Sequence, residues 1–134
     1  MPGAARVARI APVEAGTAAL NRRELARYLD RVSDRWPIDV ALLAGARAAD
    51  ERGAPAQRER GPEYVVILVS SAYEGMPWLE RVYQAGSLWD ALEMGGPADV
   101  HCYTPDEFER RRATLRAVRE AVETGLDLTR VSPP

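Results

Sequence analysis

Hydrophobic residues recur along this chain at two spacings, one typical of helices and one typical of buried strands. The first helical pattern follows Asn21, which has capping-box spacing to Glu24, and it ends at Pro37. Its apolar positions are Leu25, Tyr28, Leu29, Val32 and Trp36. The pattern therefore predicts one amphipathic helix before Pro37.

Three short apolar runs predict strands, of which the first is expected to be buried and the second to be covered on both faces. They read IDVALLAGA at 38–46, YVVILVS at 64–70 and DVHCYT at 99–104. The first run ends at Gly45, where the chain can turn sharply. Residues 48–62 are polar and contain several helix breakers, so we expect a loop between the first two strands.

Two more helical patterns follow the second and third runs. From about Pro77 an apolar stripe is interrupted by Gly86 and closed by Gly95 and Gly96. Its members are Leu79, Val82, Tyr83, Leu88, Trp89 and Leu92. The aromatic side chains of this region could stack a nucleobase, but their helical spacing favours the core for most of Tyr73, Trp78, Tyr83 and Trp89.

The last helix has the clearest start signal in the sequence. Thr104 is a suitable cap, Pro105 suits the first helical position, and Glu107 completes a capping box. We expect this helix to run to Gly125.

The order of these elements predicts an α/β (α+β) fold, in which a short mixed sheet is flanked by helices in two or three layers. Residues 17–128 are predicted to form the domain. Residues 1–16 are rich in Ala, Pro and Gly without a sustained period, which indicates a flexible N-terminal arm. Residues 129–134 are predicted to form a C-terminal tail.

Composition narrows the classes of partner. The chain has 134 residues, 46% apolar and 28% charged, as expected for one soluble globular domain. A net charge of −2 gives no electrostatic reason to expect nucleic acid or an anionic membrane as a partner. The single cysteine, Cys102, cannot form an internal disulfide, and no signal peptide or membrane-spanning run is evident. We therefore expect a cytoplasmic protein.

Three passages of the chain are similar to one known family. They are LLAGARA at 42–48, EYVVILVSSAYEGMPWLERV at 63–82 and ADVHCYTPDEFER at 98–110. Together they resemble the minimal nucleotidyltransferases, small members of the DNA polymerase beta superfamily, over about residues 20–128. The resemblance implies a nucleotidyltransferase fold. It also implies two magnesium ions, held by three carboxylates, that assist transfer of a nucleoside monophosphate from a nucleoside triphosphate to an acceptor.

The family carries a Gly-Ser turn after its first strand, and this chain keeps only part of that turn. Gly45 and Arg47 match the pattern, while Ala46 replaces the serine whose hydroxyl touches the phosphates. The resemblance implies that Gly45, Ala46 and Arg47 form the nucleotide-binding turn.

The family also carries an Asp-x-Asp pair on the second strand and one Asp on the third. Residues two apart on a strand project from one face, so such a pair presents both carboxylates to one point. Here Glu63 stands at the first position, Val65 at the second and Asp99 at the third. Glu63 and Asp99 are the candidate catalytic residues and metal ligands, with Asp50 or Glu51 as displaced ligands if the long loop shifts the alignment.

His101 adds a further candidate ligand. It lies two residues after Asp99 on the same predicted strand, so both side chains should face the same way. With Glu63 they could form a mixed carboxylate and imidazole site for zinc or manganese. A packed or exposed imidazole is the simpler interpretation.

These residues predict a degenerate nucleotidyltransferase site. The leading hypothesis is a non-catalytic module that binds a nucleotide or a protein, and the resemblance implies an all-helical HEPN protein as the partner of an antitoxin-like chain. The alternative is an active transferase that uses Mg²⁺ or Mn²⁺ on Glu63 and Asp99 with a nucleoside triphosphate. A homodimeric scaffold without a ligand is the third.

Overall fold

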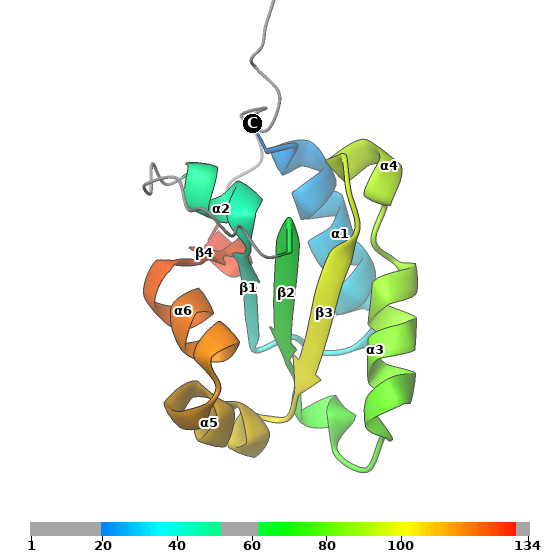
Figure 1. Ribbon diagram of the computed structural model, residues 1–134. Coiled ribbons are helices and arrows are strands. Elements are labelled where there is room, and N and C mark those ends of the chain that lie inside the picture. Colours follow the sequence, from blue (N-terminus) through cyan, green and yellow to red (C-terminus); the bar gives the residue numbers. More distant parts are fainter. Residues whose placement is uncertain (1–19, 52–61, 131–134) are drawn as a thin grey trace, which may run out of the picture.

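The computed structural model describes residues 20–51 and 62–130, so the predicted arm at 1–16 and most of the predicted tail lie outside the described residues. Four strands form one sheet in the order β3-β2-β1-β4 (Figure 1). β1 is antiparallel to β2 and β4, and β2 is parallel to β3. The strands are β1 (Val40–Ala44), β2 (Tyr64–Val69), β3 (Ala98–Tyr103) and β4 (Leu126–Asp127). The predicted mixed sheet is confirmed, and the two-residue β4 was not predicted.

The described helices flank this sheet (Figure 1). They are α1 (Arg22–Arg35), α2 (Ala46–Glu51), α3 (Trp78–Ser87), α4 (Ala91–Met94), α5 (Pro105–Thr114) and α6 (Arg116–Thr124), with 3₁₀ turns η1 (Ser71–Tyr73) and η2 (Leu128–Arg130). Among the residues that the structure describes, no helix combines the length and the apolar character needed to cross a membrane.

β2 is the centre of two hydrophobic cores because all of its residues are buried. Alternate residues of a strand point to opposite faces. One face packs against α1, α3 and α4 through Leu25, Tyr28, Val32, Tyr64, Val66, Leu68, Ala85 and Met94. The other packs against α5 and α6 through Val65, Ile67, Val69, Phe108, Val118 and Ala121. This double burial explains the nearly unbroken apolar run.

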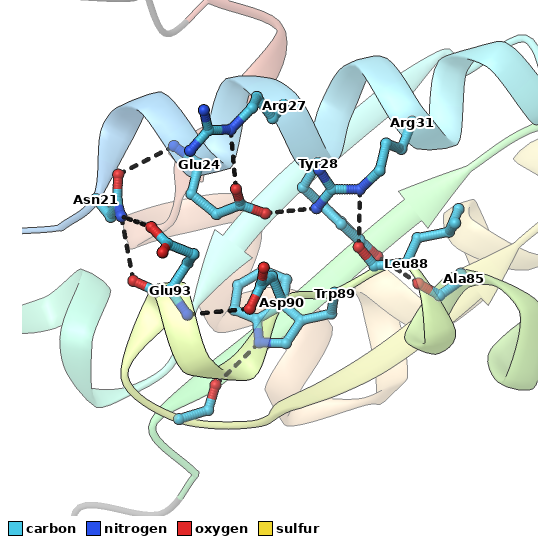
Figure 2. Close-up of polar contacts among 11 residues, drawn as sticks. Asn21, Glu24, Arg27, Tyr28, Arg31, Ala85, Leu88, Trp89, Asp90 and Glu93 are labelled. Atoms are coloured by element: carbon cyan, nitrogen blue, oxygen red, sulfur yellow. Dashed lines mark hydrogen bonds and ion pairs between the residues drawn. The ribbon is translucent and has the colours of Figure 1, made fainter.

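The predicted first helix is confirmed as α1. The Asn21 side chain accepts a hydrogen bond from the Glu24 backbone N–H, as a helix cap should. The buried Glu24 carboxylate accepts hydrogen bonds from Arg27 and Arg31 instead of completing a capping box (Figure 2). Arg31 also donates to the Leu88 carbonyl oxygen at 3.0 Å, which ties α1 to the end of α3.

Three predicted boundaries are wrong. The loop expected from residue 48 begins later, because α2 continues to Glu51 with Ala48 buried in the core. The helix expected from Pro77 is two helices, and Gly86 lies inside α3 rather than interrupting it. The helix expected up to Gly125 breaks at Leu115, whose backbone is extended. The break lets α5 and α6 cover the same sheet face from two directions.

The predicted capping box at the start of α5 is confirmed. The Thr104 hydroxyl accepts from the Glu107 backbone N–H, and the Glu107 carboxylate accepts from the Thr104 N–H. This fixes the turn from β3 into α5.

Arg81, on the inner side of α3, joins three elements although it is almost fully buried. It donates to the carbonyl oxygens of Met76 at 2.9 Å and Cys102 at 3.1 Å. Its guanidinium also lies 2.7 Å from the Glu107 carboxylate, which belongs to α5. Arg81 therefore holds α3 and α5 against β3, at an edge of the sheet.

Replacing Arg81 should be strongly destabilising. Arg81→Met would leave buried carbonyl oxygens unpaired and Glu107 without its cation, which we expect to lower the free energy of unfolding by about 3 kcal/mol. Urea unfolding followed by circular dichroism measures this. The matched change Arg119→Met, on the exposed side of α6, should stay within about 0.5 kcal/mol of the native protein. Equal losses in the two variants would contradict the role given to Arg81.

The contact between Arg81 and Glu107 makes the stability of the protein depend on pH. Hydrogen bonding from Arg81, and then from Thr104, holds the pKa of the Glu107 carboxyl below its ordinary value. A lowered folded-state pKa contributes stability that is present above the unfolded pKa, about 4.3, and is lost as the pH falls through the lower folded value. Glu107→Gln should therefore flatten the fall in urea midpoint with decreasing pH over this range. An unchanged pH profile would contradict the assignment.

Candidate functional site

The turn after β1 is built around Gly45. Its φ is +98°, and an added Cβ would lie 2.6 Å from the Glu63 carbonyl oxygen, so only glycine fits. The next two N–H groups are already bonded: Ala46 donates to the Pro62 carbonyl at 3.0 Å and Arg47 to the Glu63 carbonyl at 3.0 Å. The predicted nucleotide-binding turn thus uses both of these donors to anchor the start of β2.

The Arg47 side chain is held by contacts inside the protein. Its Nε lies 2.7 Å from Oε1 of Glu63, which makes an ion pair. Neither of these two buried atoms has a hydrogen-bond partner among the described residues, so the attraction between them is that of opposite charges. Its Nη1 donates to the Tyr64 hydroxyl at 2.9 Å and to the Met94 carbonyl at 3.4 Å, and Nη2 donates to the Gly95 carbonyl at 3.3 Å. The guanidinium also lies over the Tyr64 ring.

Tyr64 was not predicted to belong to the site. Its ring lies in the core on the α1 side of the sheet, while its hydroxyl donates to the Met94 carbonyl at 2.6 Å and meets Arg47. Burial raises the pKa of Tyr64, so its hydroxyl stays protonated and can donate. The apolar run around Tyr64 gives no sign of this polar role, because the partner carbonyl comes from α4.

The register of β2 and β3 places two of the aligned positions side by side. Val65 pairs with Asp99 across the parallel strands, so their side chains project from the same face. Val65 is only 7% exposed and packs in the core beneath α5 and α6. The Asp99 carboxylate lies at the rim of that face and is 59% exposed.

Asp99 and His101 come together as their spacing predicts. Nε2 of His101 lies 3.2 Å from the Asp99 carboxylate, and Nδ1 lies 2.9 Å from the Tyr103 hydroxyl. Glu63, in contrast, is paired with Arg47. Within residues 20–51 and 62–130 no group of three or more His, Cys, Asp and Glu side chains could hold a metal ion. The three candidate ligands are therefore divided between two separate pairs.

This donor set does not fit the two magnesium ions that the resemblance implies. Mg²⁺ requires a tight octahedron of oxygen ligands. Val65 supplies no oxygen and would place an apolar side chain beside a doubly charged ion. The Arg47 guanidinium already lies at the Glu63 carboxylate, where it would repel a second cation. Asp50 lies in α2, and the Glu51 side chain lies outside the described residues.

Cys102 has no nucleophilic role in this arrangement. Its side chain points into the core opposite to His101, as expected, and burial raises its pKa to about 11. A thiol protonated at neutral pH is a poor nucleophile.

The prediction that the aromatic residues around α3 belong to the core is only partly confirmed. Tyr73 is fully buried and Trp89 is partly buried against the same core. Tyr83 is 77% exposed and Trp78 is 42% exposed, so the prediction is wrong for Tyr83 and holds only in part for Trp78. The error arises because α3 presents apolar residues on its outer side as well as its inner side.

No protein-family model and no curated protein matches this chain. Among solved structures it is similar to the crystal structure of a proposed nucleotidyltransferase from Sulfolobus solfataricus, with a TM-score of 0.47 and 17% sequence identity. The match covers 66% of this chain and 71% of that chain. A similarity of this strength supports no conclusion about activity, ligand or partner.

Two glycines with similar backbones allow a test of the turn. Gly45 and Gly75 both have positive φ, but an added Cβ meets the Glu63 carbonyl only at Gly45 and meets nothing within 4 Å at Gly75. Gly75→Ala should cost about 1 kcal/mol for the left-handed backbone alone. Gly45→Ala should cost about 3 kcal/mol or more, because the backbone must also shift. Thermal and urea unfolding measure both; equal costs would show that the close approach is unimportant.

Proposed function

We propose that this chain is a nucleotidyltransferase-fold protein that does not catalyse nucleotidyl transfer and instead acts as a protein-binding module. The register of β2 and β3 carries the proposal. It pairs position 65 with Asp99, the two positions at which the family resemblance implies carboxylates on adjacent strands. A metal ion shared between the strands would require a carboxylate at both of these neighbouring positions, and position 65 is a valine.

The ion pair between Arg47 and Glu63 supports the same proposal. Its 2.7 Å contact puts a fixed positive charge at the carboxylate that stands first in the aligned pair. The guanidinium thus offsets the charge that a metal ion would otherwise offset, and no metal is needed to stabilise the carboxylate. An active transferase would have to break this pair before Glu63 could bind Mg²⁺ or Mn²⁺.

The donors around Gly45 favour a protein rather than a nucleotide as the ligand. A triphosphate is bound through unpaired N–H groups and cationic side chains. Here the N–H groups of Ala46 and Arg47 bond to backbone carbonyls, and the Arg47 side chain is occupied by Glu63, Tyr64 and the α4 turn. Binding a triphosphate would cost these contacts.

The family resemblance suggests the class of protein partner, which is an all-helical HEPN protein. In this proposal the chain neutralises such a partner by contact, in the manner of an antitoxin, so the loss of the carboxylate at position 65 leaves the role intact. Nucleic acid is not proposed, because the net charge is −2.

Calorimetric titration tests the part of the proposal that concerns the metal and nucleotide site. Magnesium or manganese chloride, followed by ATP or GTP, is titrated into the native protein and into Glu63→Ala, Val65→Asp and Arg47→Ala/Val65→Asp. We expect no metal-dependent nucleotide binding by the native protein. The double variant should gain at least about tenfold in metal affinity over the native protein, since it adds a carboxylate beside Asp99 and releases Glu63.

A matched control adds a carboxylate elsewhere: Leu92→Asp, on the 91% exposed Leu92 of α4, should bind no metal. Circular dichroism must show that Val65→Asp is folded, because Val65 is buried. Tight metal-dependent nucleotide binding by the native protein, abolished in Glu63→Ala, would refute the proposal in favour of an active transferase.

A further inference from the structure

One face of β3 carries a row of three side chains that are joined by hydrogen bonds. Asp99, His101 and Tyr103 alternate along the strand, so they project from the same face. Nε2 of His101 lies 3.2 Å from Oδ2 of Asp99, and Nδ1 lies 2.9 Å from the Tyr103 hydroxyl. Both ring nitrogens of the imidazole therefore have an oxygen beside them. We call Asp99, His101 and Tyr103 the β3 row.

The imidazole at the centre of the β3 row is held in one orientation by its surroundings. Its side chain is only 17% exposed. The Trp78 ring, from the start of α3, stands edge-on to it with 6.4 Å between the ring centroids, and the Tyr103 ring lies 6.0 Å away. A side chain that is ordered beforehand loses little conformational freedom when it binds a ligand. The Asp99 carboxylate is 59% exposed, so this end of the row is open to solvent.

We propose that the β3 row binds a zinc ion through Nε2 of His101 and the carboxylate of Asp99. Zinc accepts imidazole nitrogen as well as carboxylate oxygen, whereas magnesium takes oxygen ligands. Bonds of about 2.0–2.2 Å at tetrahedral angles place two zinc ligands roughly 3.4 Å apart. The 3.2 Å between Nε2 and Oδ2 is already close to that separation, so a small rotation of the carboxylate admits the ion. Water fills the remaining positions on the solvent side.

Tyr103 supplies the outer contact that such a site needs. A metal-bound imidazole generally donates its other N–H to an oxygen, which fixes the tautomer and the orientation of the ring. The Tyr103 hydroxyl oxygen stands at this place, 2.9 Å from Nδ1. When zinc occupies Nε2, the single proton of the neutral imidazole lies on Nδ1 and the hydroxyl accepts it. The ring keeps one proton throughout, so zinc binding to the neutral imidazole releases none.

The site has two protein ligands in the part of the chain that the structure describes. Glu63 is paired with Arg47, and Cys102 is buried in the core on the opposite face of β3. Two protein ligands hold zinc more weakly than the three or four of ordinary zinc sites, so we expect a dissociation constant on the order of 10 µM. The inference does not depend on the proposed function, because zinc on the β3 row requires neither a nucleotide nor a partner protein.

Nuclear magnetic resonance of the full chain, prepared without a histidine tag, tests the proposal. His101 is the only histidine, so the imidazole nitrogen signals of isotopically labelled protein report on this residue alone. Zinc chloride is the probe. We expect saturation at one zinc ion per chain, with the Nε2 signal shifted by the metal and the proton on Nδ1. Imidazole signals that zinc does not change would overturn the proposal, as would binding of the metal at Nδ1.

Calorimetric titration with zinc chloride measures the contribution of each residue. His101→Gln and Asp99→Asn should each weaken zinc binding at least tenfold, and Tyr103→Phe about tenfold through loss of the outer contact. The matched change Asp106→Asn, at an exposed carboxylate of α5, should leave the affinity unchanged. Circular dichroism must show that Tyr103→Phe is folded, because Tyr103 is buried. Equal zinc affinity in the native protein and in His101→Gln would overturn the proposal. Magnesium and nucleotide titrations report on the proposed function separately, so either idea can fail alone.

Discussion

Burial of β2 on both faces is the constraint on which the rest of this structure depends. Its six residues are all buried, and they divide between two hydrophobic cores. A strand in this position requires helices on each side, and the chain supplies α1, α3 and α4 for one face and α5 and α6 for the other. The break at Leu115 serves the same end, because it lets α5 and α6 place Phe108 and Val118 in one core. Hydrophobic burial, which scales with the apolar area removed from water, is what these arrangements share.

The same constraint shapes the candidate site. Val65 belongs to the core beneath α5 and α6, and it also stands beside Asp99 at the rim of the sheet. An apolar residue there contributes to packing, whereas a carboxylate at the same place would need a metal ion or another cation to offset its burial. At the start of β2, Arg47 offsets the charge of Glu63 and ties α2 to β2 and to the turn after α4. The chain thus stabilises the start of β2 with its own residues.

The two sides of α3 differ in burial and in polar contacts. On the inner side Arg81 satisfies the Cys102 carbonyl of the edge strand and pairs with Glu107, which closes that edge with polar contacts. Closure of an edge in this way limits unwanted strand pairing. On the outer side Leu79 and Tyr83 are exposed, so this side carries an apolar surface.

Local signals in the sequence were sufficient for most of the elements and for one of the site contacts. The capping box at Thr104, the buried run of β2 and the approach of Asp99 to His101 depend on short-range spacing, which the sequence displays directly. The contacts of Arg47 with Glu63 and with the α4 turn, the burial of Ala48 and the exposure of Tyr83 depend on which elements meet in space. Helical periodicity shows that a residue lies on an apolar face but cannot tell which of two apolar faces is covered. The sequence by itself determined the three longer strands, the helix caps at Asn21 and Thr104, and the chemistry available at each position. Only the tertiary structure decided which charges offset one another and which apolar surface stayed exposed, because both depend on long-range packing.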